Sequence, residues 1–180
     1  MGQLDGKTAL VTGGNRGLGK QFVLSLAEAG AQVAVVSRRA GEAQAAAEEV
    51  SRATGQTCLG YACDVVVPEQ VAQLVERLLA DFRQIDVLVN NAGVNVRGPI
   101  EKLSVEAFRR VQETNVTGPW LLCRALAPHF QSRRSGRVIN VGSALSVISL
   151  PERTPYATSK GAVLQLTRTL ALEWAPLGLR

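Results

Sequence analysis

The first glycine-rich segment of the chain reads Val11-Thr12-Gly13-Gly14-Asn15-Arg16-Gly17-Leu18-Gly19. It joins a β-branched run to a helical pattern, and the spaced glycines Gly13, Gly17 and Gly19 let the backbone turn sharply and approach a ligand closely. Free amides at the start of the helix favour an anion, so we predict that the segment binds the pyrophosphate of a nucleotide. Its spacing differs from the Gly-x-Gly-x-x-Gly fingerprint. It also lacks the Gly-Lys-Ser/Thr ending of a P-loop, which argues against phosphoryl transfer.

On either side of this junction, short β-branched runs alternate with alanine-rich helical stretches, and turn residues separate them. We predict strands at Thr8–Val11, Gln32–Ser37, Thr57–Ala62, Ile85–Asn90 and Arg137–Val141. We predict helices at Gly17–Ala29, Glu42–Thr54, Glu69–Phe82, Val105–Gln131 (with a break near Gly118-Pro119) and Tyr156–Ala175. The near-continuous apolarity of the strands is typical of a sheet that helices cover on both faces. The pattern therefore predicts an α/β fold with a doubly wound parallel sheet.

The composition restricts the class of protein. A chain of 180 residues with 46% apolar side chains is long enough to bury the core of one compact domain, which we expect to cover residues 1–180. No apolar run approaches the roughly 18 residues of a membrane span, and Met1–Lys7 lacks a signal-peptide core. The three cysteines are odd in number and form no Cys-x-x-Cys pair. This usage favours a reduced, cytoplasmic protein.

Charge and ligand-forming residues argue against two further classes. The formal net charge is +5, but the basic residues are spread along the chain and only 4% of residues are aromatic. We therefore predict no nucleic-acid partner. His129 is the only histidine, and no cluster of cysteine, histidine and aspartate has metal-ligand spacing, so we predict no metal site.

The end of the second predicted strand indicates which dinucleotide binds. It reads Val35-Val36-Ser37-Arg38-Arg39, with no carboxylate to accept hydrogen bonds from an adenosine ribose. Arg38, together with Arg16 of the glycine segment and the Ser37 hydroxyl, instead suits a 2′-phosphate. We therefore predict NADP rather than NAD. The alternative is that both arginines are solvated loop charges.

A second segment with a chemical signature is Tyr156-Ala157-Thr158-Ser159-Lys160, which follows Pro155 and therefore lies near a helix start. Tyr156 and Lys160 are one helical turn apart, on the same side of the helix. A phenol in water ionises near about pH 10, and a neighbouring ammonium favours the ionised form, which suits general acid–base catalysis. Ser143 follows the fifth predicted strand, at the edge where doubly wound sheets bind ligands.

Together these motifs resemble the short-chain dehydrogenase/reductase family, and the match covers nearly the whole chain. The motifs are Thr12-Gly13-x-x-x-Gly17-x-Gly19, Asp64-Val65, Asn90-Asn91-Ala92-Gly93, Asn115, Ser143 and Tyr156-x-x-x-Lys160. The resemblance implies a Rossmann-type fold. It also implies an NADP(H)-dependent oxidoreductase that interconverts a secondary alcohol and a ketone.

The resemblance further implies a role for each motif residue. Tyr156 would be the general acid or base at the reacting oxygen, and Ser143 would hydrogen-bond the same oxygen. Lys160 would hold the nicotinamide ribose and favour ionisation of Tyr156, while Asn115 would keep a water in a proton relay. The cofactor would contact Gly13, Asn15, Arg16, Gly17, Leu18, Gly19, Ser37, Arg38, Asp64, Val65, Asn91, Ala92, Gly93, Tyr156 and Lys160. Taken singly, several of these side chains also suit a plain role as caps or turn residues.

The substrate is less constrained. Arg97 is positioned to meet a substrate carboxylate, beside Ser143 and Tyr156, and the stretch from Arg153 to Val163 resembles the gluconate 5-dehydrogenase branch. A 3-oxoacyl-carrier-protein reductase is an equally open interpretation, and Arg97 also suits a plain surface charge. An alternative of another class is a non-catalytic dinucleotide-binding module.

The family pattern continues beyond Arg180 with a sixth strand, a cofactor loop, a lid helix and a seventh strand. On this resemblance we expect the fifth strand to form an uncovered sheet edge, and the 180-residue chain to be weakly active or inactive. The family also implies that the full-length form is a homodimer or homotetramer that packs through Val116–Gln131 and Tyr156–Ala175.

Overall fold

The computed structural model describes residues 2–180, which form a five-stranded parallel sheet in the order β3-β2-β1-β4-β5. The strands are β1 (Thr8–Thr12), β2 (Gln32–Ser37), β3 (Cys58–Ala62), β4 (Val87–Asn90) and β5 (Arg137–Asn140). All five predicted strands are confirmed, with ends that differ by one or two residues. The chain moves outward from β1 in one direction to β3 and then crosses back to β4 and β5, which confirms the predicted doubly wound arrangement.

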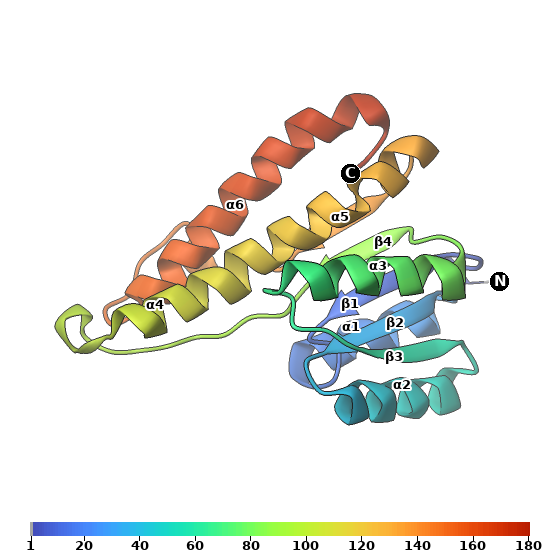
Figure 1. Cartoon of the computed structure of the whole chain (residues 1–180), viewed down its shortest axis with the longest axis horizontal. Coiled ribbons are helices and arrows are strands. Elements are labelled where there is room, and N and C mark those ends of the chain that lie inside the picture. The colour runs from blue at the N-terminus through green and yellow to red at the C-terminus, as the bar shows by residue number, and fades with distance from the viewer. Residues whose placement is uncertain (1) are drawn as a thin grey trace.

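Helices cover both faces of this sheet (Figure 1). They are α1 (Gly17–Glu28), α2 (Ala40–Thr54), α3 (Pro68–Phe82), α4 (Val105–Gln112), α5 (Gly118–Arg133) and α6 (Thr154–Trp174). Helices α1 and α2 pack on one face, whereas α3, α5 and the end of α6 pack on the other. Along the chain, the helices lie close to the predicted ranges.

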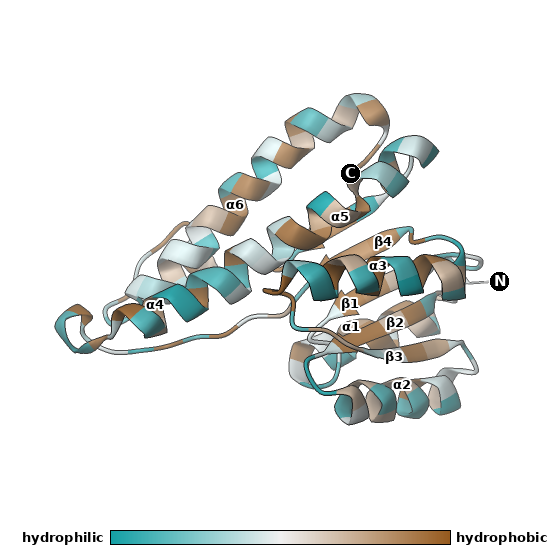
Figure 2. Cartoon of the chain, in the orientation of Figure 1, coloured by the Kyte–Doolittle hydropathy of each residue, from teal (hydrophilic) through white to brown (hydrophobic). Residues whose placement is uncertain are grey.

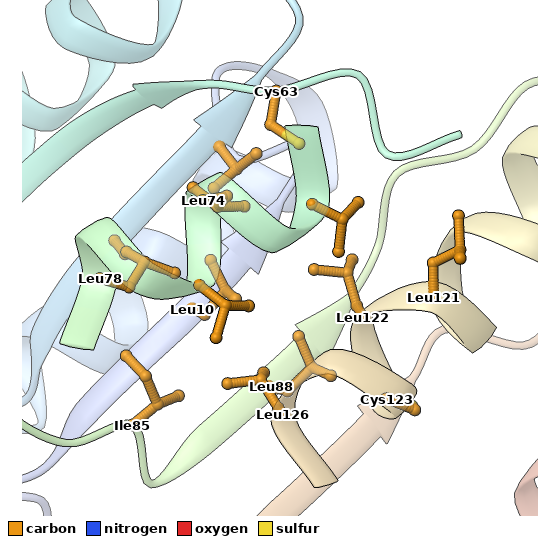
Figure 3. Packing of buried hydrophobic residues seen from close by; sticks show 14 of the residues in the cluster. Leu10, Cys63, Leu74, Leu78, Ile85, Leu88, Leu121, Leu122, Cys123 and Leu126 are labelled. Atoms are coloured by element: carbon orange, nitrogen blue, oxygen red, sulfur yellow. The ribbon is translucent and has the colours of Figure 1, made fainter. Parts of the chain in front are cut away.

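Successive residues of each central strand enter different cores. In β1, Ala9 and Val11 contact the core under α1 and α2, while Leu10 contacts the core under α3 and α5. Side chains alternate across a strand, so a strand with both faces covered must be apolar at every position. Figure 2 shows central strands that are mainly apolar between helices of mixed character. Figure 3 shows Leu10 and Leu88 packed against side chains of α3 and α5.

The predicted break near Gly118-Pro119 is wrong. The chain stays helical from α4 to α5 through a wide π-helical turn at Glu113–Thr117. Pro119 follows this turn directly, and it has no N–H to donate to the carbonyl four residues back, which favours a distortion of the helix at this point. The distortion lies one turn before the predicted break, and it contains Asn115.

The outer edge of β5 is partly paired, which corrects the expectation of an uncovered edge. Leu179 pairs in parallel with Gly136. The Arg180 N–H donates to the Gly136 carbonyl at 3.1 Å, and the Arg180 carbonyl accepts from the Val138 N–H at 2.8 Å. Within residues 2–180, no helix has both the length and the apolar character needed to cross a bilayer.

Candidate cofactor cleft and active site

The glycine turn between β1 and α1 leaves helix amides open to a ligand. Gly13 and Gly17 have φ angles of +63° and +54°, in the left-handed region that favours glycine. A Cβ on Gly19 would lie 2.0 Å from the Gly13 carbonyl oxygen, so only glycine lets the helix start so close to the strand. Within residues 2–180, no side chain caps the first turn of α1. Its N–H groups and the helix dipole therefore favour an anion at this point.

Thr12 and Asn91 tie the end of β4 to this turn. The Thr12 Oγ1 accepts from the N–H groups of Asn91 and Ala92 at 3.1 and 3.0 Å. The Asn91 Nδ2 donates to the Thr12 carbonyl at 2.9 Å and to the Gly13 carbonyl at 3.2 Å. The Asn91 side chain thus holds the turn in shape, a positioning role that the sequence analysis did not assign. Asn91, Ala92 and Gly93 line the cleft beside it.

A cleft of about 580 Å³ opens at this carboxyl edge of the sheet. Every predicted nucleotide contact except Tyr156 and Lys160 lines it: Gly13, Asn15, Arg16, Gly17, Leu18, Gly19, Ser37, Arg38, Asp64, Val65, Asn91, Ala92 and Gly93. Six polar or charged residues that were not predicted also line it: Arg39, Glu42, Cys63, Arg110, Glu113 and Thr114. A Cβ on Gly17 would meet no atom within 4 Å, so the backbone there faces open space. The open amides and this space fit the pyrophosphate of a dinucleotide.

The turn after β2 lines one part of the cleft with two arginines, Arg38 and Arg39. The Ser37 hydroxyl closes its own turn, because it donates to the Arg39 carbonyl at 2.8 Å. Arg39 forms an ion pair with Glu42, and the Asn15 Nδ2 donates to the same carboxylate at 2.8 Å. Arg38 is exposed at the cleft wall. The sequence has no carboxylate at the end of this strand, but Glu42 brings one to the cleft from the first turn of α2.

Asp64 was predicted to contact the cofactor. In the structure its Oδ1 accepts from the Val66 N–H at 3.3 Å, and its own N–H donates to Gln70 Oε1 at 2.8 Å. These bonds hold the turn between β3 and α3 beside the cleft. Asp64 and Val65 both line the cleft.

Tyr156 and Lys160 lie together at the start of α6, as predicted. Pro155 is in the first turn of the helix, and the Lys160 Nζ lies 5.6 Å from the centre of the Tyr156 ring. Lys160 is only 7% exposed. Its ammonium donates to the Val141 carbonyl at 2.5 Å, just beyond the end of β5. Burial lowers the pKa of Lys160 below its ordinary value, because desolvation disfavours the charged form.

Ser143 caps the short helix Ala144–Ser146, which packs against α6. Its Oγ accepts from the Leu145 N–H at 3.1 Å. Among residues 2–180, no hydrogen bond joins the Tyr156 hydroxyl to Ser143 or Lys160. The fold therefore brings the three segments to one corner, with the Ser143 hydroxyl proton still available to a ligand.

Asn115, in the π-helical turn, has its side chain fully engaged. Its Oδ1 accepts from the Val94 N–H at 2.8 Å, and its Nδ2 donates to the Val94 carbonyl at 2.9 Å and to Ser159 Oγ at 3.0 Å. The Ser159 hydroxyl in turn donates to the Tyr156 carbonyl at 2.7 Å. Ser159 is fully buried, and the sequence analysis did not assign it a role. These bonds position the loop after β4 against the start of α6.

A second hollow, of about 410 Å³, lies beside the Ser143 and Tyr156 corner. It is lined by Leu145, Ser146, Val147, Ile148, Ser149, Leu150, Arg153, Thr154, Ala157 and Thr158. Val147 is 75% exposed, an unusual position for an apolar side chain. Arg97, the predicted substrate contact, lines neither this hollow nor the cleft, although the Gly98 N–H donates to the Glu152 carbonyl at 3.2 Å. Arg153 is the arginine that reaches the hollow.

Other chemistry receives little support from the described residues. Among residues 2–180, no group of three or more histidine, cysteine, aspartate or glutamate side chains is arranged to hold a metal ion. All three cysteines are buried and free. Burial raises the pKa of Cys63 and of Cys123 to about 11, so both remain protonated thiols at neutral pH.

Comparison with known proteins identifies the family. The model of the short chain dehydrogenase family matches residues 7–180, and the chain belongs to this family. The 2-dehydro-3-deoxy-D-gluconate 5-dehydrogenase of Pseudoalteromonas atlantica is 37% identical over 179 residues, which cover 98% of this chain and 69% of the relative. The chain spans 58% to 69% of the length of three curated relatives that it matches.

Solved structures agree with this assignment. The crystal structure of NAD⁺-bound xylitol dehydrogenase has a TM-score of 0.95 and 34% identity, over 99% of this chain and 68% of that one. The gluconate 5-dehydrogenase of Burkholderia cenocepacia in complex with NADP and tartrate has a TM-score of 0.94 and 34% identity, over 98% of this chain and 69% of that one. These similarities confirm the Rossmann-type fold. The three relatives named above are dehydrogenases.

Proposed function

We propose that this chain provides the dinucleotide-binding and catalytic residues of an NADP(H)-dependent oxidoreductase that interconverts a secondary alcohol and a ketone. The observation that supports it best is the pairing of Tyr156 with the buried Lys160 ammonium. This pair starts α6 at the carboxyl edge of the sheet, the edge on which the uncapped α1 helix and the glycine turn also open. The reduced, buried cysteines fit a cytoplasmic protein.

The choice of NADP rests on the cations at the end of β2. Arg16, Arg38 and Arg39 line the same cleft, and together they offer three guanidinium groups to a 2′-phosphate. The similar solved structures include one with NAD⁺ and one with NADP, so similarity to them does not distinguish the two cofactors. The arginines favour NADP.

The chain's own side chains supply the proton chemistry. A bound nicotinamide would supply the hydride donor or acceptor. Tyr156 would donate its phenolic proton to the carbonyl oxygen during reduction and take it back from the hydroxyl during oxidation. Lys160 would favour the phenolate through its charge and would hold the ribose hydroxyls. Ser143 would donate its free hydroxyl proton to the same oxygen, while Asn115 and Ser159 keep the loop and helix in register.

For the substrate, we propose a sugar acid of the gluconate and 5-ketogluconate type. The names of two relatives, a 2-dehydro-3-deoxy-D-gluconate 5-dehydrogenase and a gluconate 5-dehydrogenase, support this class. Arg153, at the hollow beside Tyr156, offers a cation to a carboxylate, and Arg97 lies one residue from the contact between Gly98 and the loop before α6. We expect the active form to be a homodimer or homotetramer.

The test is the reduction of a panel of carbonyl compounds with NADPH. The rate is measured from the loss of absorbance of the reduced nicotinamide. The panel includes 5-ketogluconate and a β-ketoacyl thioester. The rates are compared between the 180-residue chain and a form extended beyond Arg180, because the chain spans only 58% to 69% of the length of three curated relatives. Tyr156→Phe should lower the rate by at least about 100-fold, because the general acid is lost, with the NADPH dissociation constant unchanged.

The matched control is Tyr61→Phe at the other tyrosine of the chain. The Tyr61 hydroxyl donates to Asp81 Oδ2 at 2.7 Å, away from the cleft, so this variant should keep the wild-type rate. A Tyr156→Phe variant with the wild-type rate would contradict the proposed chemistry. NADPH binding without turnover of any carbonyl by either form would instead favour the dinucleotide-binding module, and preferred reduction of the thioester would favour a 3-oxoacyl-carrier-protein reductase.

A further inference from the structure

Glu42 occupies an unusual position for an acidic residue, at the cationic end of the cleft. It lies in the first turn of α2, five residues beyond the end of β2. One carboxylate oxygen pairs with the Arg39 Nη2 at 2.5 Å, and the other accepts from the Asn15 Nδ2 at 2.8 Å. The glycine turn and the turn after β2 are thereby joined through one carboxylate.

The Glu42 carboxylate disfavours binding of an adenosine with a 2′-phosphate more than binding of one with a 2′-hydroxyl. A 2′-phosphate bound among Arg16, Arg38 and Arg39 would carry up to two negative charges. Glu42 adds a like charge to that end of the cleft and already engages one of the three guanidinium groups. An adenosine with a free 2′-hydroxyl carries no charge at that point and meets no such repulsion. The other acids that line the cleft, Asp64 and Glu113, lie on the turns after β3 and α4.

We propose that Glu42 is a specificity-determining residue that competes with the 2′-phosphate for Arg39 and so limits the preference for NADP(H) over NAD(H). This inference rests on the proposed dinucleotide site. Arg39 exchanges its carboxylate partner for the phosphate when the phosphorylated cofactor binds. Because the Arg39 side chain is 74% exposed, it is free to turn from one anion to the other. The single carboxylate therefore tunes how strongly three arginines select the phosphorylated dinucleotide.

The test uses fragments that isolate the phosphate. Calorimetric titration of the 180-residue chain with 2′,5′-ADP and with 5′-AMP compares dissociation constants with and without the 2′-phosphate. Glu42→Gln keeps an oxygen that accepts from Asn15 but removes the charge. It should tighten 2′,5′-ADP about five-fold, the size expected for one partly screened charge at a surface. The affinity for 5′-AMP should stay within about two-fold, and the gain for 2′,5′-ADP should shrink in about 0.5 M salt.

A matched control lies on the same helix. Glu48 accepts from Gln44 Nε2 at 2.9 Å and does not line the cleft. Glu48→Gln changes the net charge by the same amount as Glu42→Gln. Because Glu48 lies outside the cleft, this variant should leave both affinities unchanged. Equal tightening of 2′,5′-ADP by Glu48→Gln and Glu42→Gln would overturn the proposal, because the effect would then be one of overall charge.

A second variant tests the competition itself. Arg39→Gln should weaken 2′,5′-ADP about five-fold. Glu42→Gln should give a clearly smaller gain in that background, since only the direct repulsion between the carboxylate and the phosphate remains to be removed. Additive effects of the two substitutions, or a Glu42→Gln variant with wild-type selectivity, would overturn the proposal. Thermal unfolding checks that each variant is folded.

Failure of the cofactor assignment is separately visible. Fluorescence titration with NADPH and NADH reports whether the wild-type chain binds a dinucleotide. Binding of neither would overturn both the proposed function and the role of Glu42. Binding of both, with selectivity that does not respond to Glu42→Gln, would overturn the role of Glu42 alone.

Discussion

Asp86 is a buried charge at the opposite edge of the sheet from the cleft. It is 5% exposed, and its carboxylate accepts from the Thr8 N–H at 3.0 Å, from Gln84 Nε2 at 3.1 Å and from Arg133 Nη2 at 3.0 Å. Burial opposes ionisation, but the Thr8 amide, Arg133 and Lys7 together outweigh it and hold the pKa of Asp86 below its ordinary value. Asp86 therefore links the starts of β1 and β4 to the end of α5.

The lowered pKa of Asp86 predicts an acid-labile contribution to stability. The folded chain binds the Asp86 proton more weakly than the unfolded chain, so the contribution is present above the unfolded pKa of about 3.9 and is lost as pH falls through the lower folded pKa. Asp86→Asn should lower the unfolding free energy at neutral pH by about 2–3 kcal/mol and flatten its acid limb. Urea unfolding at several pH values measures both. The exposed Glu101→Gln is the control, and an equal effect there would contradict the assignment.

At the scale of elements, α2 lies very close to β3 because of one glycine. A Cβ on Gly60 would lie 2.4 Å from the Gln44 backbone nitrogen and 2.5 Å from the Ala43 carbonyl carbon. The helix also turns alanines toward the sheet, with Ala43, Ala46 and Ala47 all buried. Small residues on both elements let the helix and strand backbones approach. The short distance between the two backbones fixes the position of Glu42, which is next to Ala43, relative to the cleft.

A methyl group at Gly60 should therefore push α2 outward. Gly60→Ala is expected to lower the unfolding free energy by about 1–3 kcal/mol through overpacking. Denaturant unfolding measures the change. Gly41→Ala is the matched control, because a Cβ there meets no atom within 4 Å and alanine favours the helix, so it should be neutral or stabilise by up to about 1 kcal/mol. A Gly60→Ala variant as stable as the wild type would show that the helix has room to move.

At the scale of the whole molecule, α4, α5 and α6 extend as an arm beyond the sheet, and α6 packs against α4 (Figure 1). Large apolar side chains of this arm face solvent, among them Phe108 at 39% exposure and Trp120 at 47%. The Arg124 guanidinium lies over the Trp120 ring, 5.4 Å from its centre. Exposed aromatic side chains on neighbouring helices are typical of an interface.

We expect two copies of the chain to pack through α5 and α6, with Trp120 in the contact. Light scattering after size exclusion should give a mass of at least twice the 19.2 kDa of one chain. Trp120→Glu should give monomers, because it removes the aromatic side chain from the contact and places there a charge that is costly to take out of water. Ile100→Glu changes an apolar residue with 70% exposure outside these helices and should leave the mass unchanged. A monomeric wild-type chain would contradict the prediction.

The parts of the fold and site that the sequence predicted depend on neighbours along the chain. A strand is marked by a run of β-branched residues, and the glycine turn by a few adjacent positions. Tyr156 and Lys160 are one turn apart on any helix, so their pairing follows from spacing alone. Because such interactions are local, the sequence alone predicts the five strands, the glycine turn and the Tyr156–Lys160 pair.

Other features required the packed molecule, since their partners lie far apart in the chain. Glu42 meets Asn15 across 27 residues, and Asn115 meets Ser159 across 44. The π-helical turn that carries Asn115 also replaced the expected break at Gly118-Pro119. No local pattern records which distant side chains meet, because that depends on how strands pair and how closely helices pack on them. The proposed binding and catalytic residues can therefore be predicted from the amino-acid sequence. The contacts that hold these residues in place depend on how the helices pack on the sheet.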